Sequence, residues 1–326
     1  MINILVVGGA GYIGSHMVWL LGQKNVNIIV LDNLSSGHRD AITYGTFIYG
    51  DLSDVDLLRK IFLDHRIDVV IHFASYIQVG ESNRHPAKYY ANNVVNTLNL
   101  LNAMNEQGVD KLIFSSTAAI FGNPIYLPID ELHPKQPINT YGRTKLIIEQ
   151  ALEDYDRAYG LRSVCLRYFN AAGAHPDGIL CERHDPETHL IPLVLAATES
   201  EGKPIAVFGN DYNTADGTCV RDYIHVMDLA EAHWLALEHL LKEGKSTAFN
   251  LGNGAGSSVN EIIASATNVT KSEVKHSFEN RREGDPAVLI SDSNKIRTEL
   301  GWKAHYSNIE QIIEHAWFAK NLQHSH

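Results

Sequence analysis

The sequence predicts an α/β fold: a doubly wound parallel sheet with a smaller mixed α/β domain beside it. Two observations indicate this. Over the first half of the chain, short apolar runs rich in β-branched residues alternate with helical patterns, which is the order that produces a parallel sheet. After Asn170 the alternation gives way to a stretch rich in Gly, Pro, His and Asp, so we expect the second unit to begin there.

The first apolar run, residues 2–7, ends in three glycines at three-residue spacing, Gly8, Gly11 and Gly14, directly before a helical pattern. This strand–turn–helix context is typical of a dinucleotide site. The first glycine allows a tight turn, and the second lets backbone approach a pyrophosphate. The third lets helix and strand pack closely, with the helix N-terminus facing the phosphates. The alternative is a tight turn that binds no ligand.

The second strand, residues 27–31, ends at Asp32, 18 residues after Gly14. That is close to the distance at which an acidic residue binds the adenosine ribose hydroxyls. A carboxylate there repels a 2′-phosphate, which favours NAD over NADP, although an arginine such as the nearby Arg39 accommodates that phosphate in other proteins. The alternative for Asp32 is an ordinary residue at a strand end.

Further strands are expected over residues 46–49, 68–74, 111–115 and 163–168, and helices over 55–64, 86–104 and 141–159. In a doubly wound sheet the ligand lies beyond the carboxyl ends of the strands. The residues at or just past those ends are therefore expected to line one crevice: Gly14, Asp32, Asp51, Phe73, Ala74, Ser115, Ser116, Thr117, Tyr168, Phe169 and Asn170.

The second half of the chain predicts a helix near residues 193–199 and an apolar strand over 205–209. Two later segments, residues 221–241 and 248–252, are expected to return to the first sheet. The prediction is therefore two interleaved domains: residues 1–170 with return segments near 221–252, and residues 171–326.

The composition, 44% apolar and 20% charged among 326 residues, is that of an ordinary globular protein, and a net charge of −11 argues against a nucleic-acid partner. No apolar run reaches the roughly 18 residues that a membrane span needs. The three cysteines are far apart, so we expect a cytoplasmic protein without disulfides or a membrane segment. The pairs His72/His85 and His184/His189 lack a convincing ligand spacing, so no metal site is predicted.

Tyr141 and Lys145 lie four residues apart at the start of a predicted helix, which places them on one face. A phenol with a pKa of about 10 is a poor base at neutral pH, and a nearby ammonium or cationic nicotinamide ring favours the phenolate. Thr117, at an earlier strand end, supplies a hydroxyl for a substrate oxygen. Alone, such a pair is usually an ordinary surface pair, but beside a dinucleotide site it indicates catalysis.

Gly-x-x-Gly-x-x-Gly, Thr117 and Tyr-x-x-x-Lys together resemble the extended short-chain dehydrogenase/reductase superfamily. Later segments are more specific, and with them the chain resembles the UDP-glucose 4-epimerase family from end to end. These segments are residues 167–170, 173–176, 189–192, 208–212, 217–226 and 281–285.

The resemblance implies NAD-dependent 4-epimerisation of a UDP-hexose, UDP-galactose to UDP-glucose, through a transient 4-keto sugar. It implies that Tyr141 takes the proton of the C4 hydroxyl, that Thr117 shuttles or stabilises this proton, and that Lys145 tunes Tyr141 and holds the nicotinamide ribose. The family's cofactor positions fall, beyond the three glycines, on Tyr12, Ile13, Asp32, Asn33, Asp51, Leu52, Phe73, Ala74, Asn92, Lys145 and Tyr168. Its sugar-nucleotide positions fall on Thr117, Tyr141, Asn170, His189, Leu190, Phe208, Arg221, Arg282, Asp285 and Leu289.

Three departures from the family bear on the site. Ile77 stands where some members have a lysine near the cofactor, and His189 stands where others have asparagine. Leu289 lies where side-chain size separates members restricted to UDP-glucose and UDP-galactose from members that also accept N-acetylated sugars, and leucine is intermediate. UDP-N-acetylhexosamines and UDP-pentoses therefore remain alternative substrates.

Two functions of other kinds are disfavoured. A nucleotide-sugar 4,6-dehydratase needs a carboxylic acid pair close to Thr117, where this chain has Ala118 and Ala119. A non-catalytic dinucleotide sensor commonly lacks the tyrosine or the lysine that this chain keeps.

The helical stretches 90–104 and 146–155 are apolar on more than one side. We therefore expect a homodimer in which these helices form a four-helix interface. The alternative is that both helices are covered within one chain.

Overall fold

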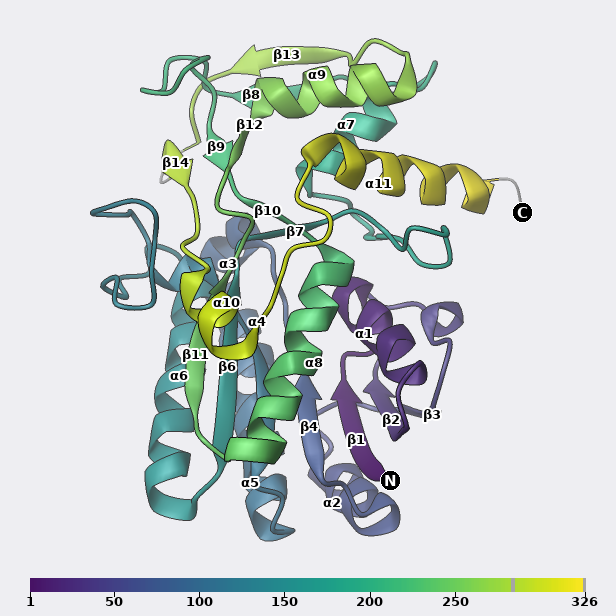
Figure 1. Ribbon diagram of the computed structural model, residues 1–326, viewed down its shortest axis with the longest axis vertical. Helices are drawn as coiled ribbons and strands as arrows, with labels where there is room; N and C mark the ends of the chain where they lie inside the picture. The colour runs from purple at the N-terminus through teal and green to yellow at the C-terminus, as the bar shows by residue number, and fades with distance from the viewer. Residues whose placement is uncertain (283–284, 325–326) are drawn as a thin grey trace.

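The centre of the computed structural model, which describes residues 1–282 and 285–324, is a seven-stranded sheet with the order β11–β6–β5–β4–β1–β2–β3 (Figure 1). Every neighbouring pair is parallel. This is the order of a doubly wound Rossmann sheet, so the predicted fold class is confirmed. The strands are β1 (Ile2–Val7), β2 (Val26–Asp32), β3 (Thr46–Tyr49), β4 (Val69–His72), β5 (Lys111–Thr117), β6 (Arg162–Tyr168) and β11 (Thr247–Leu251).

Helices cover both faces of this sheet. The side chains of β1 show this, because Ile4 and Val6 belong to one buried cluster and Leu5 and Val7 to the other. A strand buried on both faces is apolar throughout, which explains the near-continuous apolar runs in the sequence. The first face is covered by α1 (Tyr12–Gly22), α8 (Val226–Glu243) and α10 (Asn294–Leu300), and the second by α2 (Val55–His65), α5 (Asn96–Glu106) and α6 (Thr140–Tyr159).

The helix predicted over residues 86–104 is interrupted. It consists of α4 (Pro86–Tyr89), a π-helical turn, η2 (Tyr90–Val95), and α5. Within the turn, buried Asn93 accepts the Tyr76 N–H at 2.9 Å and donates to the Tyr76 carbonyl at 3.0 Å and to Thr144 Oγ1 at 3.1 Å. The π-turn therefore accompanies a polar anchor that ties this helix to α6 and to the loop after β4.

The upper part of Figure 1 is built from later residues. Its apolar core packs three helices against β8, which pairs in parallel with β13. The helix predicted near residues 193–199 begins earlier, at Leu190. These elements are α7 (Leu190–Ala197), α9 (Val259–Thr270), α11 (Ile309–His324), β8 (Ile205–Phe208) and β13 (His276–Glu279). Two small sheets adjoin them: β7 (Asn170–Ala172) with β10 (Tyr223–His225), and β9 (Val220–Arg221) between β12 (Ser257–Ser258) and β14 (Val288–Leu289).

The chain returns to the first sheet as expected, since β11 pairs with β6 and α8 packs beside α1 (Figure 1). Ile296 and Trp302, near α10, also belong to the first buried cluster, although the predicted boundary places them with the second domain. The remaining short helices are η1 (Arg39–Ala41), α3 (Val79–Arg84) and η3 (Ala118–Ile120). Across the described residues, none of the helices combines the length and hydropathy that a membrane span requires.

Candidate active site

Two of the three glycines after β1 are required by the fold itself. Gly8 has a φ of +80°, and a Cβ there would lie 2.5 Å from the Ala74 nitrogen; at Gly14 it would lie 2.1 Å from the Gly8 carbonyl oxygen. At Gly11 the nearest atom would be 3.5 Å away. Gly11 is the N-cap of α1 and makes no side-chain cap, so the first N–H groups of that helix are left for an external acceptor. The turn therefore fits a pyrophosphate at Gly11.

Asp32 ends β2 beside this turn. Its Oδ2 accepts the Ala10 N–H at 2.9 Å, and its Oδ1 accepts the Leu34 N–H at 2.8 Å. Burial raises the pKa of Asp32, and the two backbone hydrogen bonds act in the opposite direction. Each carboxylate oxygen keeps a further lone pair, so the group can still accept from ribose hydroxyls.

Asn33 and Asp51 are joined at the neighbouring strand ends. Asn33 Nδ2 donates to Asp51 Oδ2 at 2.6 Å, and Asn96 Nδ2 donates to Oδ1 at 3.2 Å. Burial opposes ionisation of Asp51, but the hydrogen bonds from Ser53 and Asn33 outweigh it and lower the pKa. The structure thus holds an ionised carboxylate where the resemblance predicts a cofactor residue.

The other predicted cofactor residues lie along the same edge of the sheet. Phe73 and Ala74 follow β4, and both backbone N–H groups donate to the Val7 carbonyl. Tyr168 ends β6. Leu52 is buried after Asp51, and Asn92 is half-buried in η2. Tyr12 and Ile13 are the first two residues of α1.

Tyr141 lies in the first turn of α6 with 8% of its surface exposed. Asn139 Oδ1 caps this helix by accepting the Gly142 N–H at 2.8 Å, and the Tyr141 N–H donates to Ser82 Oγ at 3.1 Å. Burial raises the pKa of the Tyr141 phenol to about 12, and a hydrogen bond from the Thr117 hydroxyl acts to lower it. The structure therefore brings together the tyrosine and the threonine that the sequence singles out.

Lys145 is buried one turn further along α6, on the side of the helix that the spacing predicts. Its Nζ donates to the Ser115 carbonyl at 2.8 Å and lies 4.8 Å from the centre of the Phe114 ring. Burial lowers the pKa of Lys145 to about 7. The expected lowering of the Tyr141 pKa by this ammonium is not found, because burial dominates at both residues.

A buried ion pair beside Lys145 was not anticipated from the sequence. Glu149 and Arg167 have side chains 2% and 5% exposed, and two hydrogen bonds of 2.9 and 2.7 Å join them. Ser116 Oγ also donates to Glu149, at 2.6 Å. The pair ties α6 to β5 and β6 next to Lys145. The available signal was spacing, because Glu149 follows Tyr141 and Lys145 at intervals of four on one helix face.

Leu289 connects the upper region to the segment that follows Thr117. It pairs with Arg221 through β14 and β9, and it packs against the small buried cluster of Ala118, Ile120, Phe121 and Ile129. Apolar packing thus brings together residues at least 160 positions apart in the sequence.

Four more of the predicted sugar-nucleotide residues lie in two contacting pairs. Arg221 lies with its Nη2 3.6 Å from Asp285 Oδ1. The guanidinium of Arg282 lies 3.9 Å from the centre of the Phe208 ring. Of the resembling segment 281–285, Glu283 and Gly284 lie outside the described residues.

Asn170, His189 and Leu190 occupy other places. Asn170 begins β7 and is exposed, whereas Leu190 begins α7 and His189 is its N-cap. His189 Nδ1 hydrogen-bonds Glu182. Burial opposes protonation of His189, but the interaction with Glu182 raises its pKa.

A further residue that the sequence did not indicate is Asp222. It is fully buried, and its Oδ1 accepts the Asn253 N–H at 2.7 Å while Oδ2 accepts those of Gly254 and Ser291, each at 3.0 Å. These bonds join the loop after β11 to the segment after β14. One carboxylate therefore sets the position of the strand that carries Leu289.

A doubly wound sheet with this glycine turn, an acidic residue after β2 and a buried Tyr–Lys pair define a dinucleotide-binding α/β protein. Residues 4–252 match the model of the NAD dependent epimerase/dehydratase family, and the chain belongs to that family.

Relatives named for one activity match nearly the whole chain. It is 53% identical over 314 residues to the UDP-glucose 4-epimerase of Halalkalibacterium halodurans, which covers 96% of this chain and 94% of the relative. It is 48% identical, with a TM-score of 0.95, to the structure of UDP-glucose 4-epimerase from Brucella ovis in complex with NAD, covering 97% and 98%. It is 42% identical, with a TM-score of 0.86, to the UDP-Glc/GlcNAc 4-epimerase from Campylobacter jejuni, covering 99% and 100%.

Proposed function

We propose that this chain catalyses the NAD-dependent 4-epimerisation of UDP-hexoses and interconverts UDP-galactose and UDP-glucose. The observation that carries the proposal is the buried Tyr141 phenol beside the Thr117 hydroxyl, at the carboxyl edge of the sheet in a chain of this family. The names of its relatives agree with this reaction.

The residues of the glycine turn fit NAD. Gly11 leaves room for a pyrophosphate at the start of α1, and Asp32 keeps acceptor lone pairs for ribose hydroxyls. When bound, NAD supplies the acceptor that takes a hydride from sugar C4 and returns it. We assign the cofactor to Gly8, Gly11, Tyr12, Ile13, Gly14, Asp32, Asn33, Asp51, Leu52, Phe73, Ala74, Asn92, Lys145 and Tyr168.

Tyr141 removes the proton of the C4 hydroxyl, and Thr117 donates a hydrogen bond that stabilises the phenolate. Moving the pKa of Tyr141 from about 12 to neutrality requires roughly 7 kcal/mol of differential stabilisation. Positive charge near the phenol is the proposed source. Because Lys145 alone does not lower the pKa of Tyr141, we assign most of this stabilisation to a cationic nicotinamide ring, to which Lys145 adds when it is protonated. After the 4-keto sugar has turned within the site, Tyr141 returns the proton, and no net oxidation results.

The sugar nucleotide is assigned to residues of both regions. Arg221 and Arg282 carry the charge that a diphosphate needs in an acidic protein. Leu289 packs against the buried cluster that follows Thr117, and we propose that it limits the size of the sugar. The assigned set is Thr117, Tyr141, Asn170, His189, Leu190, Phe208, Arg221, Arg282, Asp285 and Leu289.

The proposed NAD-binding domain consists of residues 1–170 and 221–252. The packing of α10 against the first buried cluster adds a short segment to it. The rest of 171–326 is the proposed UDP-sugar-binding domain.

We also propose a cytoplasmic location, because buried Cys165 and Cys219 form no disulfide. Recovery of the protein in an oxidising compartment on cell fractionation would contradict this.

A homodimer is proposed from the surfaces of η2 and α6. Val95 is 53% exposed and Tyr90 36%, and Ile147 and Tyr155 are half-buried, so apolar side chains remain for a second copy to cover. Two such helix pairs across a two-fold axis would form a four-helix interface. Light scattering at micromolar concentration is expected to give the dimer mass, and a monomer mass would overturn this proposal.

The experiment that tests the function incubates the protein with UDP-galactose in the absence of added NAD and then stops the reaction. The UDP-glucose formed is measured afterwards with a UDP-glucose-dependent dehydrogenase and the NAD that this second enzyme consumes. We expect activity without added NAD in protein that retains the cofactor, and a loss of about 10²–10⁴-fold in kcat for Tyr141→Phe. Folded, NAD-loaded protein that is inactive on UDP-hexoses would overturn the proposal. A 4-keto-6-deoxy product would instead support the dehydratase, which Ala118 and Ala119 disfavour.

A further inference from the structure

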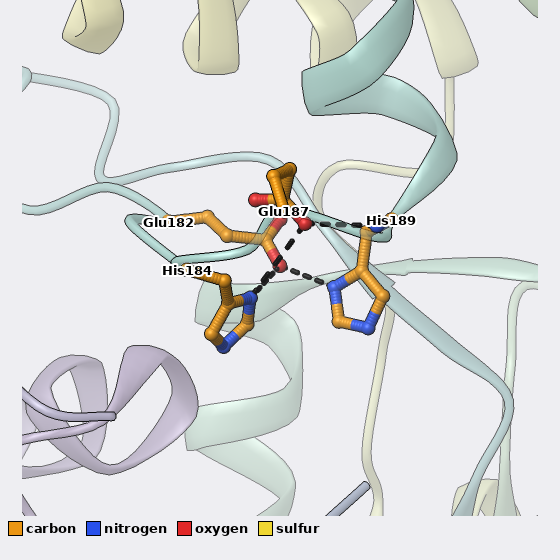
Figure 2. Close-up of side chains that lie close together, drawn as sticks. All are labelled: Glu182, His184, Glu187 and His189. Atoms are coloured by element: carbon orange, nitrogen blue, oxygen red, sulfur yellow. Dashed lines mark hydrogen bonds and ion pairs between the residues drawn. The ribbon is translucent and has the colours of Figure 1, made fainter. Parts of the chain in front are cut away.

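The loop between β7 and α7 gathers four metal-ligating side chains, Glu182, His184, Glu187 and His189. One ligand atom from each lies within 4.8 Å of all the others. His184 Nδ1 lies 2.9 Å from Glu182 Oε1 and 3.8 Å from Glu187 Oε1, and His189 Nδ1 also contacts Glu182 Oε1. Figure 2 shows both imidazoles presenting Nδ1 to the same carboxylate.

We propose that these four side chains bind one divalent transition-metal ion of the zinc class. Imidazole nitrogens and carboxylate oxygens are ligands that zinc accepts in proteins, and these side chains supply the four ligands that tetrahedral coordination needs. Two carboxylates neutralise a dication, whereas Mg²⁺ and Ca²⁺ prefer oxygen ligands throughout.

The present distances are close to those that binding needs. Metal–ligand bonds of about 2.0–2.2 Å place the ligand atoms of a tetrahedral site roughly 3.3–3.5 Å apart. Small side-chain rotations therefore suffice, with the His–Glu hydrogen bonds exchanged for metal bonds. Glu182 has a side chain 6% exposed and His189 one that is 38% exposed, so the site has a buried floor and an open side through which an ion enters.

Glu187 is already oriented by the loop itself. A single carboxylate oxygen, Oε1, accepts the backbone N–H groups of Thr188 and His189 at 2.7 and 2.8 Å. Backbone hydrogen bonds to a ligating carboxylate are the kind of outer contact that fixes metal ligands in place. The neighbouring charge, Arg183, is directed away, because both of its terminal nitrogens donate to Asp40 at 2.8 Å.

The cluster lies where a bound ion would link the nucleotide-binding region to α7. On one side the loop contacts the nucleotide-binding region, since the His184 ring lies 6.3 Å from that of Tyr12 and the His38 ring hydrogen-bonds the Arg183 carbonyl at 2.8 Å. On the other side His189 leads directly into α7. A bound ion would therefore fix His189 and Leu190 relative to the glycine turn. The role of these two residues toward the sugar nucleotide rests on the proposed function, but the metal-binding proposal itself does not.

The test measures metal binding without reference to activity. Full-length protein is treated with a chelator, dialysed and titrated with Zn²⁺ by calorimetry, and bound zinc is counted by atomic emission. We expect about one ion per chain, and Co²⁺ in its place should give the visible absorption of a four-coordinate site. Glu187→Gln and His184→Gln should each weaken binding at least about 10–100-fold, the loss that changes even to outer contacts cause.

His276→Gln serves as the matched control, because His276 is exposed on β13 outside the cluster. It should bind zinc like the wild type, and circular dichroism should show that all three variants are folded. Absence of zinc binding by the wild type, or equal binding by both cluster variants, would overturn the site and leave only ion pairs between these side chains.

A second measurement uses only the wild type, so it remains valid even if a variant fails to fold. Zn²⁺ added to the wild type should slow hydrogen exchange of the backbone amides in residues 182–190 at least about tenfold and leave β13 unchanged. Zinc that binds without protecting this loop is bound elsewhere, which would overturn the assignment.

Discussion

The seven-stranded sheet and the region above it in Figure 1 are stabilised in different ways. The sheet is a continuous ladder of parallel strands with apolar clusters on both faces. The upper region has an apolar core of its own but only sheets of two or three short strands, and its loops depend on single buried side chains such as Asp222. We infer that the sheet sets the global stability, whereas a few polar residues above it set the geometry toward the sugar.

The strongest test of this difference is Glu149→Gln, a change on α6 beside the main sheet. The change leaves the buried guanidinium of Arg167 without its counter-charge, and breaking such a pair costs about 3–5 kcal/mol. We expect a loss of this size in the free energy of unfolding, measured with urea. Glu153→Gln, an exposed position on the same helix, is the control and should change the stability little.

The same pair predicts a dependence on pH. Burial opposes ionisation of Glu149, but the hydrogen bonds and charge of Arg167 lower its pKa below the usual 4.5. This contribution to stability is therefore present above about pH 4.5 and is lost as the pH falls toward the lower folded-state pKa. Below about pH 4.5, the free energy of unfolding measured with urea should fall more steeply with decreasing pH for the wild type than for Glu149→Gln. An equal dependence on pH in the two proteins would contradict the prediction.

Two glycine variants separate folding from cofactor binding within the sheet region. In Gly14→Ala the new Cβ meets the Gly8 carbonyl at 2.1 Å, so we expect a loss of roughly 1–3 kcal/mol in stability together with loss of NAD. In Gly11→Ala the nearest atom is 3.5 Å away, so stability should be kept while NAD affinity falls. Calorimetry measures the stability of each variant, and the NAD content of the purified protein measures cofactor binding. Equal destabilisation by the two variants would contradict the steric argument.

Asp222→Asn tests the upper region. An amide NH₂ would face backbone N–H groups that now donate to a carboxylate, which costs about 1–3 kcal/mol locally. We expect KM for UDP-galactose to rise while NAD content is unchanged. Asp177→Asn, at an exposed position, is the control. Loss of NAD from Asp222→Asn would show that the two regions are not separable in this way.

The smallest effect is expected for Leu289→Ala. This half-buried side chain packs against the cluster of Ala118, Ile120, Phe121 and Ile129, and its truncation leaves space beside the segment that follows Thr117. We expect the ratio of kcat/KM for UDP-N-acetylgalactosamine over UDP-galactose to rise about tenfold or more, within the 1–3 kcal/mol that hydrophobic pockets discriminate. An unchanged ratio would place the determinant of sugar size elsewhere.

The main sheet and the upper region also differ in how much of their structure can be predicted from the sequence. The strands of the main sheet, the glycine turn and the Tyr141/Lys145 face follow from local periodicity and short spacings, so they are readable along the chain. The packing of Leu289 against the cluster after Thr117 and the three hydrogen bonds to Asp222 depend on segments far apart in sequence, and no local pattern indicates them.

One expectation differs from the structure for a physical reason, and one grouping of side chains was not anticipated. The pKa of Tyr141 was expected to fall beside Lys145, but desolvation of both groups outweighs their attraction. The grouping of His184 and His189 with two glutamates was not anticipated, because one pair of histidines by itself is a weak indication of a metal site. The loop brings them together with Glu182 and Glu187 through its own turn, and irregular turns carry no periodic signal.

The position of β11 has a consequence for synthesis on the ribosome. This strand completes the edge of the sheet beside β6 but is encoded roughly 80 residues later. At about 5–20 residues per second, the edge of β6 waits roughly 4–16 s for its partner. An unpaired edge of this kind is open to pairing with other chains, so nascent chains halted before residue 247 should aggregate more readily than those halted after 260.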